Sequence, residues 1–396
     1  MKPSQSIFKL KNEVQNYPWG STTSIPQLFC INNDENQPIA EIWMGAHPKA
    51  SSAIKVQERT TLLSNFIEEH KVNVLGETAA KQFGELPFLF KVLAAEKALS
   101  IQVHPSKSQA ESGYKKENSL GISLTASDRN YKDSNHKPEL VYALTSYLAM
   151  NGFRPFVDIL SQFEGLNSTA LREDVNEFSK SLDSDGLAKL FKTLLELSGT
   201  KKQSAISELL AWAETEKDPV GKLILELNDQ YPNDAGLFAP LLLNVIELKP
   251  GEAMFLDAGT PHAYLRGTAL EIMANSDNVL RAGLTPKFID TDELISCCKF
   301  KPLNNWDILT EPSTEGCESI FYIPVDDFNF AIYENPFQHV IEPKGAEIWF
   351  AIDSDATFVT ASNEEVLLTK GESVFIPHYC GQLTVTTKGK LARAFY

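Results

Sequence analysis

The chain has 396 residues, of which 43% are hydrophobic and 22% are charged, so it is long enough for two or three domains with sizeable cores. The formal net charge of −16 argues against nucleic acid or an anionic membrane as the main partner. Residues 1–15 lack the apolar run of a secretory signal, and no stretch approaches the roughly 20 apolar residues that span a bilayer. The five cysteines are odd in number and lack metal-site spacing, which predicts reduced thiols and a cytoplasmic protein.

The N-terminal part of the chain predicts short strands separated by turns. Residues 16–20 form a loop in which Trp19 is most simply the anchor of a surface turn, and His47 is most simply a structural histidine. The apolar strand 86–93 is interrupted by Lys91. A lysine at such a position either reaches solvent from a strand end or is held for an anionic ligand.

Residues 99–105 alternate apolar and polar side chains, the pattern of a strand with one apolar face. Ser100, Gln102 and His104 share the polar face, and the last two could reach one metal ion. Glu139 enters the apolar stretch of the next predicted strand (residues 135–144), which is costly for a carboxylate unless it is paired or bound to a metal.

The hydrophobic period changes to 3.6 between residues 155 and 231, which predicts a domain of several amphipathic helices without catalytic features. A strand pattern returns after residue 244, and the Gly-Glu turn at 251–252 is echoed at 371–372. We therefore expect a mainly β protein with two jelly-roll barrels, one metal-binding and one degenerate, and a helical insertion. The predicted parts are a metal-binding domain (1–152 and 236–312), the helical insertion (153–235) and a metal-free C-terminal barrel (313–396).

The segment around His262 is the most specific metal signal in the chain. A Gly-Glu turn, a strand and a glycine turn lead into His262, an arrangement that resembles the second half of a cupin metal motif. Tyr264 shares the face of His262, and Glu271 lies on the face opposite Leu270 and Ile272. Two imidazoles, a carboxylate and an amide oxygen suit Zn²⁺, although Mn²⁺ and Fe²⁺ fit the same donors. The four candidate ligands are Gln102, His104, Glu139 and His262.

The chain resembles the class I mannose-6-phosphate isomerases, zinc enzymes of the double-cupin type. The motifs that carry the resemblance run from Asn16 to Lys287 and include N-Y-x-W-G (16–20), E-x-W-M-G-x-H-P (41–48), L-P-F-L-F-K-V-L (86–93), S-I-Q-x-H-P (100–105), N-H-K-P-E (135–139), G-F-R-P (152–155), P-H-A-Y (261–264) and N-S-D-N-V-L-R-A-G-L-T-P-K (275–287). Pro18 departs from the family pattern.

This resemblance implies one Zn²⁺ per chain, held by the four candidate ligands. It also implies that Arg281 is catalytic and that Lys137, Tyr264 and Glu271 line the same pocket. Ser100 and Lys91 fall on positions proposed to contact phosphate. Trp19 and Lys287 are added as substrate contacts, since Lys287 extends the positive charge that an acidic protein needs around a sugar phosphate.

The implied reaction interconverts mannose 6-phosphate and fructose 6-phosphate through a cis-enediol, for mannose utilisation and the supply of a GDP-mannose precursor. It requires a base, charge stabilisation on two oxygens and exclusion of water. Glu271 and Lys137 are the first candidates for the base, and Tyr264 or a zinc-bound water are the second. Glu271 is equally well explained as a structural partner of Arg281 or Lys137. We expect a monomer whose partner is the small sugar phosphate.

Two other functions fit parts of the pattern. An Fe²⁺ oxygenase of the cupin type would use more histidines or a facial triad without the extra glutamine. A catalytically inactive sugar-phosphate sensor would be expected to lack a ligand or Arg281, and neither is missing. The isomerase is favoured over both.

Overall fold

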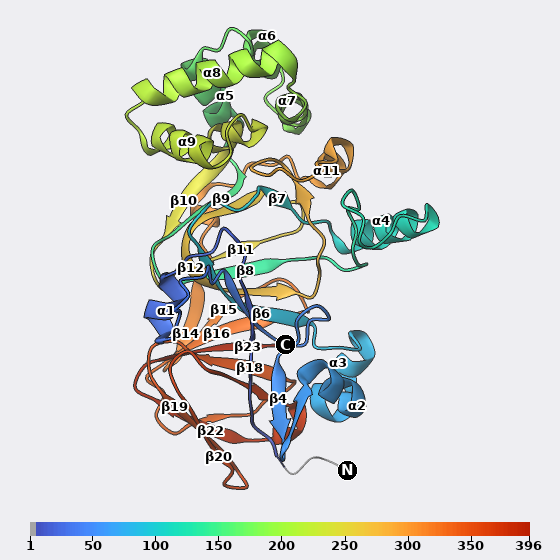
Figure 1. Ribbon diagram of the computed structural model, residues 1–396, viewed down its shortest axis with the longest axis vertical. Coiled ribbons are helices and arrows are strands. Elements are labelled where there is room, and N and C mark those ends of the chain that lie inside the picture. The colour runs from blue at the N-terminus through green and yellow to red at the C-terminus, as the bar shows by residue number, and fades with distance from the viewer. Residues whose placement is uncertain (1–4) are drawn as a thin grey trace.

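The computed structural model describes residues 5–396 and shows an elongated molecule (Figure 1). A group of helices lies at one end, a ten-stranded sheet lies in the middle, and a seven-stranded and a four-stranded sheet lie at the other end. The protein is therefore mostly sheet with a helical insertion, as the sequence predicts.

The ten-stranded sheet is organised around β12 (His262–Ala274). Its first half pairs with β7 (Gln102–Val103) and β9 (Tyr147–Phe153), and its second half pairs with β6 (Phe88–Ala95) and β8 (Glu139–Ala143). The strand changes neighbours near Gly267, whose φ is +119° and where a Cβ would lie 2.4 Å from the backbone oxygen of Ser146. Only glycine fits this bend. The other strands are β2 (Glu13–Gln15), β3 (Glu41–Met44), β10 (Leu243–Leu248), β11 (Ala253–Leu256) and β13 (Leu280–Arg281).

One face of this sheet packs against the C-terminal part of the chain. Alternate residues of β6 and β12, including Phe90 and Ile272, share a hydrophobic core with Phe330 and Phe350 of the seven-stranded sheet. Because successive strand residues point to opposite faces, Lys91 and Glu271 point away from this core. They therefore lie on the face that carries the metal-ligand candidates.

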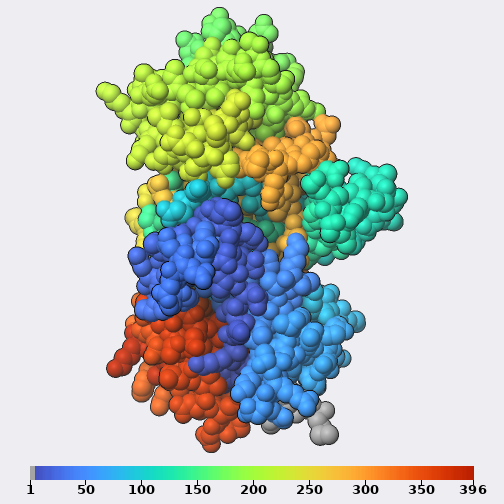
Figure 2. All heavy atoms as spheres, in the orientation of Figure 1, coloured from blue at the N-terminus to red at the C-terminus, as the bar shows by residue number. Residues whose placement is uncertain are grey.

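The seven-stranded sheet joins both ends of the described chain. Strand β1 (Phe8–Lys9) pairs with β21 (Ser373–Ile376), and in Figure 2 the N-terminal residues in blue lie directly against the C-terminal residues in red. The other strands of this sheet are β14 (Pro312–Glu315), β15 (Glu318–Phe321), β16 (Asn329–Glu334), β18 (Glu347–Ala351) and β23 (Lys390–Phe395). The four-stranded sheet contains β17 (His339–Ile341), β19 (Ala356–Thr360), β20 (Glu365–Leu368) and β22 (Leu383–Thr387).

The repeated Gly-Glu turns occupy similar places in the two parts. They lead into β11 and β21, and each of these strands pairs with a strand that begins with a buried glutamate, Glu139 in β8 and Glu347 in β18. Glu347 accepts a hydrogen bond from the guanidinium of Arg393 at 3.0 Å. The C-terminal copy thus neutralises its buried carboxylate with an internal cation.

The predicted helical region is confirmed. Its helices are α5 (Phe156–Leu166), α6 (Arg172–Phe178), α7 (Ser184–Leu195), α8 (Gly199–Thr215) and α9 (Pro219–Gln230), followed by η1 (Ala235–Phe238) and α10 (Ala239–Leu242). On α7 the apolar side chains of Leu187, Leu190, Phe191 and Leu194 are buried in a core shared with the neighbouring helices, and Leu195 packs against it half-buried. No predicted site residue lies in these helices.

The smaller elements surround the sheets. They are α1 (Ser24–Phe29), β4 (Ala53–Val56), β5 (Arg59–Leu62), α2 (Leu63–Leu75), α3 (Glu77–Gln82), α4 (Lys107–Ser119), α11 (Thr291–Cys297), η2 (Asn305–Asp307) and η3 (His378–Cys380). None of the helices within residues 5–396 has the length and apolar character needed to cross a membrane. All five cysteines are free, as predicted.

Two predicted strands are shorter than the sequence pattern suggests. Of residues 99–105 only Gln102 and Val103 lie in a strand, although the alternation persists, with Ile101 and Val103 buried. Of residues 135–144 only 139–143 do so. The segment before Glu139 is irregular, and side chains elsewhere in the fold bind its backbone in place of a sheet ladder.

Candidate metal centre and active site

Three strands place polar residues in one row across the sheet. Gln102 of β7 pairs with His262 of β12 on one side and with Arg281 of β13 on the other. Directly paired residues of antiparallel strands project from the same face, so these three side chains share it. The row brings together two predicted metal ligands and the predicted catalytic arginine, which lie far apart in the chain.

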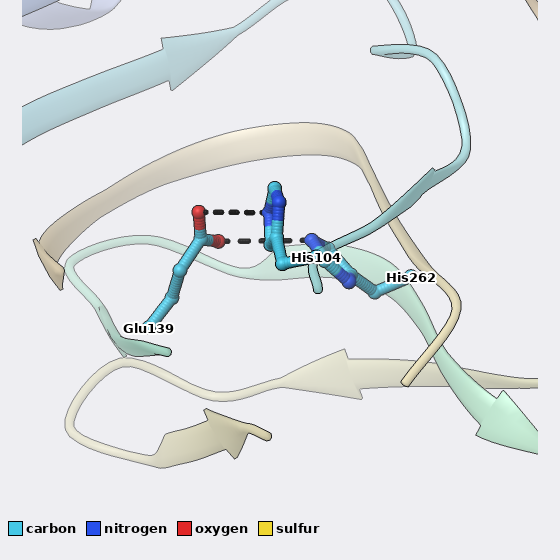
Figure 3. Close-up of side chains that lie close together, drawn as sticks. All are labelled: His104, Glu139 and His262. Atoms are coloured by element: carbon cyan, nitrogen blue, oxygen red, sulfur yellow. Dashed lines mark ion pairs between the residues drawn. The ribbon is translucent and has the colours of Figure 1, made fainter. Parts of the chain in front are cut away.

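His104, Glu139 and His262 converge at one point (Figure 3). The Nε2 atom of His104 lies 3.2 Å from one carboxylate oxygen of Glu139, and the Nε2 atom of His262 lies 3.7 Å from the other. The three residues are 2%, 1% and 2% exposed in chain order. Three potential donor atoms are therefore gathered in a site shielded from water.

Backbone carbonyls fix the tautomer of both histidines. Nδ1 of His104 lies 2.7 Å from the carbonyl oxygen of Asn278, and Nδ1 of His262 lies 2.9 Å from that of Thr260. A carbonyl oxygen only accepts, so each Nδ1 carries the proton and each Nε2 keeps a lone pair. Burial lowers the pKa of His104 to about 4 and also lowers that of His262. Both rings are thus neutral, the form that binds a metal.

These residues fit a divalent metal ion. The buried Nε2 of His104 has no hydrogen-bond partner among the described residues. One ligand atom each of His104, Glu139 and His262 lies within 4.8 Å of the others. An unpartnered lone pair beside a carboxylate and a second imidazole matches the donor set that Zn²⁺ prefers. Gln102 is half-buried beside His262 and could supply the amide oxygen.

Two further predicted residues bind the carboxylate of Glu139. The Lys137 ammonium lies 2.9 Å from Oε1, and the Tyr264 hydroxyl donates to Oε2 at 2.5 Å. Burial alone would raise the pKa of Glu139, but the charge of Lys137 opposes it, and that pKa lies well below its usual range. Burial and the charge of Glu139 raise the pKa of Tyr264. The glutamate is therefore ionised and the phenol keeps its proton.

Glu271 is paired with Lys91. The expectation that its structural partner would be Arg281 or Lys137 is wrong, since its carboxylate lies 2.8 Å from the Lys91 ammonium. β6 and β12 place the two residues directly opposite each other. Lys91 is only 6% exposed, which excludes the alternative that it reaches solvent, and Glu41 lies 3.6 Å from its ammonium on the other side.

Burial and neighbouring charges set the protonation of this pair. Burial would lower the pKa of Lys91, but Glu271 and Glu41 raise it above its ordinary value. Burial raises the pKa of Glu271, and Lys91 partly opposes this shift. Glu271 is therefore a desolvated carboxylate on the same face as the metal-ligand cluster.

Arg281 and Lys287 supply positive charge without a carboxylate partner. Neither forms an ion pair within 4.0 Å in the part of the chain from residue 5 to 396. Burial lowers the pKa of Arg281, and burial followed by the charge of Arg281 lowers the pKa of Lys287. Cations without a carboxylate partner can receive an anion.

Trp19 and Ser100 belong neither to the metal cluster nor to the Lys91–Glu271 ion pair. Trp19 is half-buried, packs against the cluster that contains Tyr264, and stacks on Tyr17 with 5.7 Å between ring centroids. Ser100 is half-buried, and within residues 5–396 its hydroxyl forms no hydrogen bond to the other site residues. The predicted residues thus fall into a metal cluster, a buried ion pair, the two cations and these two further side chains.

Sequence reasoning missed Glu41 and Asn278. Glu41 accepts a hydrogen bond from the indole of Trp43 at 2.8 Å and faces Lys91. The signal was a Glu-x-Trp on one face of an apolar strand. Asn278 is fully buried and orients His104 through its carbonyl. Its signal was the unusually polar run that follows the apolar strand β12.

Comparisons with known proteins agree with this arrangement. Residues 7–156 match the family model of the phosphomannose isomerase type I catalytic domain, and residues 165–243 match that of its helical insertion domain. The mannose-6-phosphate isomerase of Escherichia coli (strain K12) is 48% identical over 391 residues, covering 98% of this chain and 99% of the relative. The enzyme of Homo sapiens is 38% identical over 362 residues, covering 83% and 82%.

Solved structures are similar over the whole chain. A mutant of phosphomannose isomerase from Salmonella typhimurium has a TM-score of 0.96 at 47% identity, with 99% of each chain covered. A zinc-bound mannose 6-phosphate isomerase has a TM-score of 0.94 at 47% identity, again with 99% of each chain covered.

Proposed function

Since the chain belongs to the type I phosphomannose isomerases, we propose that it interconverts mannose 6-phosphate and fructose 6-phosphate with the aid of zinc. The observation that carries the proposal is the pair of histidines whose free Nε2 atoms face the carboxylate of Glu139. His104, Glu139 and His262 would hold the ion, with the amide oxygen of Gln102 as the fourth protein ligand. A zinc ion held there would act as a Lewis acid toward oxygens of the open-chain sugar.

We assign Glu271 as the base that removes the proton from the sugar carbon. In the aldose-to-ketose direction the base removes the proton from C2, which gives a cis-enediolate. O1 gains a proton, O2 loses one and C1 receives one, so the hydrogen count of the sugar is unchanged. Burial raises the pKa of Glu271, which brings a carboxylate closer to the basicity that proton abstraction needs. Lys91 keeps this carboxylate in place at 2.8 Å. Lys137 is the second candidate for the base.

The remaining residues position the substrate. Tyr264 and Lys137 hold Glu139 ionised and oriented. Arg281 and Lys287 would bind the phosphate or stabilise the negative charge of the enediolate, since a guanidinium suits both tasks. Ser100, Lys91 and Trp19 stay predictions as phosphate or substrate contacts. The charge of Lys91 is already matched by two buried carboxylates, so we assign the binding of the anion to Arg281 and Lys287.

We extend the proposal to the domain arrangement, the cellular compartment and the metabolic role. The sheets of residues 1–152 and 236–312 would form the metal-binding cupin-type jelly roll and residues 313–396 its metal-free counterpart, with residues 153–235 as the insertion. The placement of Glu139 and Glu347 at the starts of corresponding strands supports this pairing. We also propose a cytoplasmic monomer that serves mannose utilisation or the supply of GDP-mannose.

The test is isomerisation of mannose 6-phosphate by the purified protein, before and after chelation and after return of Zn²⁺. We expect activity that is lost with the chelator and restored by about one zinc per chain. A protein that binds zinc but does not turn over would overturn the isomerase and favour a sensor. A protein that holds Fe²⁺ by metal analysis and does not isomerise the sugar phosphate would instead point to the oxygenase class.

A further inference from the structure

The segment that carries Lys137, which we call the lysine loop (residues 132–138), contains no helix or strand. Its first half is bound by residues that follow β12. The side chain of Asn278 accepts a hydrogen bond from the backbone N–H of Lys132 at 2.7 Å and donates to the carbonyl of Asn135 at 2.8 Å. Among residues 5–396, neither His136 nor Lys137 forms a backbone hydrogen bond. In this second half the carbonyl of Pro138 accepts a backbone hydrogen bond from Ala274 at 3.2 Å, whereas His136 is held through its side chain.

The side chain of His136 is held by the C-terminal part of the chain. Nε2 of His136 lies 2.8 Å from Oδ2 of Asp327, which belongs to the connection between β15 and β16. Asp327 is 6% exposed, and the next residue, Phe328, is fully buried. The buried carboxylate of Asp327 is thus a fixed acceptor for His136, although the two residues lie 191 positions apart in the chain.

We propose that Asp327 is a positioning residue for the isomerase reaction, acting through His136 on the lysine loop. Adjacent Cα atoms are about 3.8 Å apart across a trans peptide, so anchoring His136 also restricts Lys137. The Lys137 ammonium lies 2.9 Å from Oε1 of Glu139 and orients this carboxylate. Misplacement of such a group by about 1 Å can cost up to 100-fold in rate. The metal-free part of the molecule would in this way support catalysis without touching the substrate.

This inference rests on the proposed function, and its test separates the two. The full-length, zinc-loaded wild type is compared with Asp327→Ala, Asp327→Asn and His136→Ala in the same isomerase assay. We expect kcat of Asp327→Ala to fall about 10- to 100-fold with KM and zinc content unchanged. Asp327→Asn should recover most of kcat, because its amide oxygen still accepts the hydrogen bond from His136.

Asp326 provides the matched control, because it is the exposed neighbour of Asp327 and carries the same charge. Asp326→Ala should keep the wild-type kcat. The double variant Asp327→Ala with His136→Ala should be no slower than His136→Ala alone, since the two side chains act as one contact.

Four results would overturn the inference while leaving the function intact. In the first, the wild type is active and Asp327→Ala has the same kcat. In the second, kcat of Asp327→Ala falls only in proportion to a loss of bound zinc or of folded protein. In the third and fourth, Asp327→Asn is as slow as Asp327→Ala, or the effects of Asp327→Ala and His136→Ala on kcat are additive. An inactive zinc-loaded wild type would instead remove the proposed function itself.

Discussion

Replacing Lys91 with methionine should destabilise the protein more than replacing Glu271 with glutamine. The Lys91 ammonium lies 2.8 Å from Glu271 and 3.6 Å from Glu41, and none of the three residues is more than 6% exposed. Lys91→Met leaves two buried carboxylates unpaired, which costs about 3–5 kcal/mol. Glu271→Gln leaves Lys91 paired with Glu41 and keeps a hydrogen-bonding amide, so we expect a loss of about 1–3 kcal/mol.

Urea unfolding at neutral pH, followed by circular dichroism, measures this difference. The free energy of unfolding of a domain is about 5–15 kcal/mol, so Lys91→Met should move the midpoint clearly. The double variant Lys91→Met with Glu271→Gln should be more stable than Lys91→Met alone, because only Glu41 is then a buried carboxylate without a cation. The control is Lys9→Met, which breaks an exposed pair with Glu372 and should change stability by less than about 1 kcal/mol. The reasoning would be refuted if the free energy of unfolding of Lys91→Met equalled or exceeded that of Glu271→Gln.

Three further outcomes are expected. Burial lowers the pKa of His47 to about 4 from 6.5, so the unfolded chain binds a proton that the folded protein does not bind as the pH falls through this window. This linkage lowers the stability of the wild type by about 3 kcal/mol in acid, so urea titrations at pH 7 and 4.5 should show a smaller loss of stability in His47→Gln than in the wild type. Asn278→Ala should weaken zinc binding about 10- to 100-fold in a competition assay with a chromogenic chelator, because it loosens the backbone that orients His104; unchanged affinity would contradict this role. Arg281→Lys should lower kcat/KM for the sugar phosphate at least about 10-fold in steady-state kinetics, since an ammonium cannot bind an anion through two parallel hydrogen bonds; wild-type kinetics would place the anion elsewhere.

The ligand set shows how far local patterns reach. Alternation placed Gln102 and His104 on a polar face, and the glycine turn before His262 marked the start of a strand. Both signals depend on residues adjacent in the chain. The length of the first strand was overestimated because alternation reports which residues are buried, whereas a strand also needs a neighbour to complete its ladder.

The partners of buried charges depended on the tertiary structure. The apolar run around Lys91 showed by itself that a lysine there needed an explanation, but Glu271 and Glu41 became its partners only when β12 and β3 paired with β6 on either side. The sequence therefore determined the helical region, the β-rich parts and the residue types of the metal centre, since each follows from local periodicity and donor chemistry. Only the tertiary structure decided which charges meet, as in the contact of His136 with Asp327, because strand order and packing between distant segments leave no trace in local spacing.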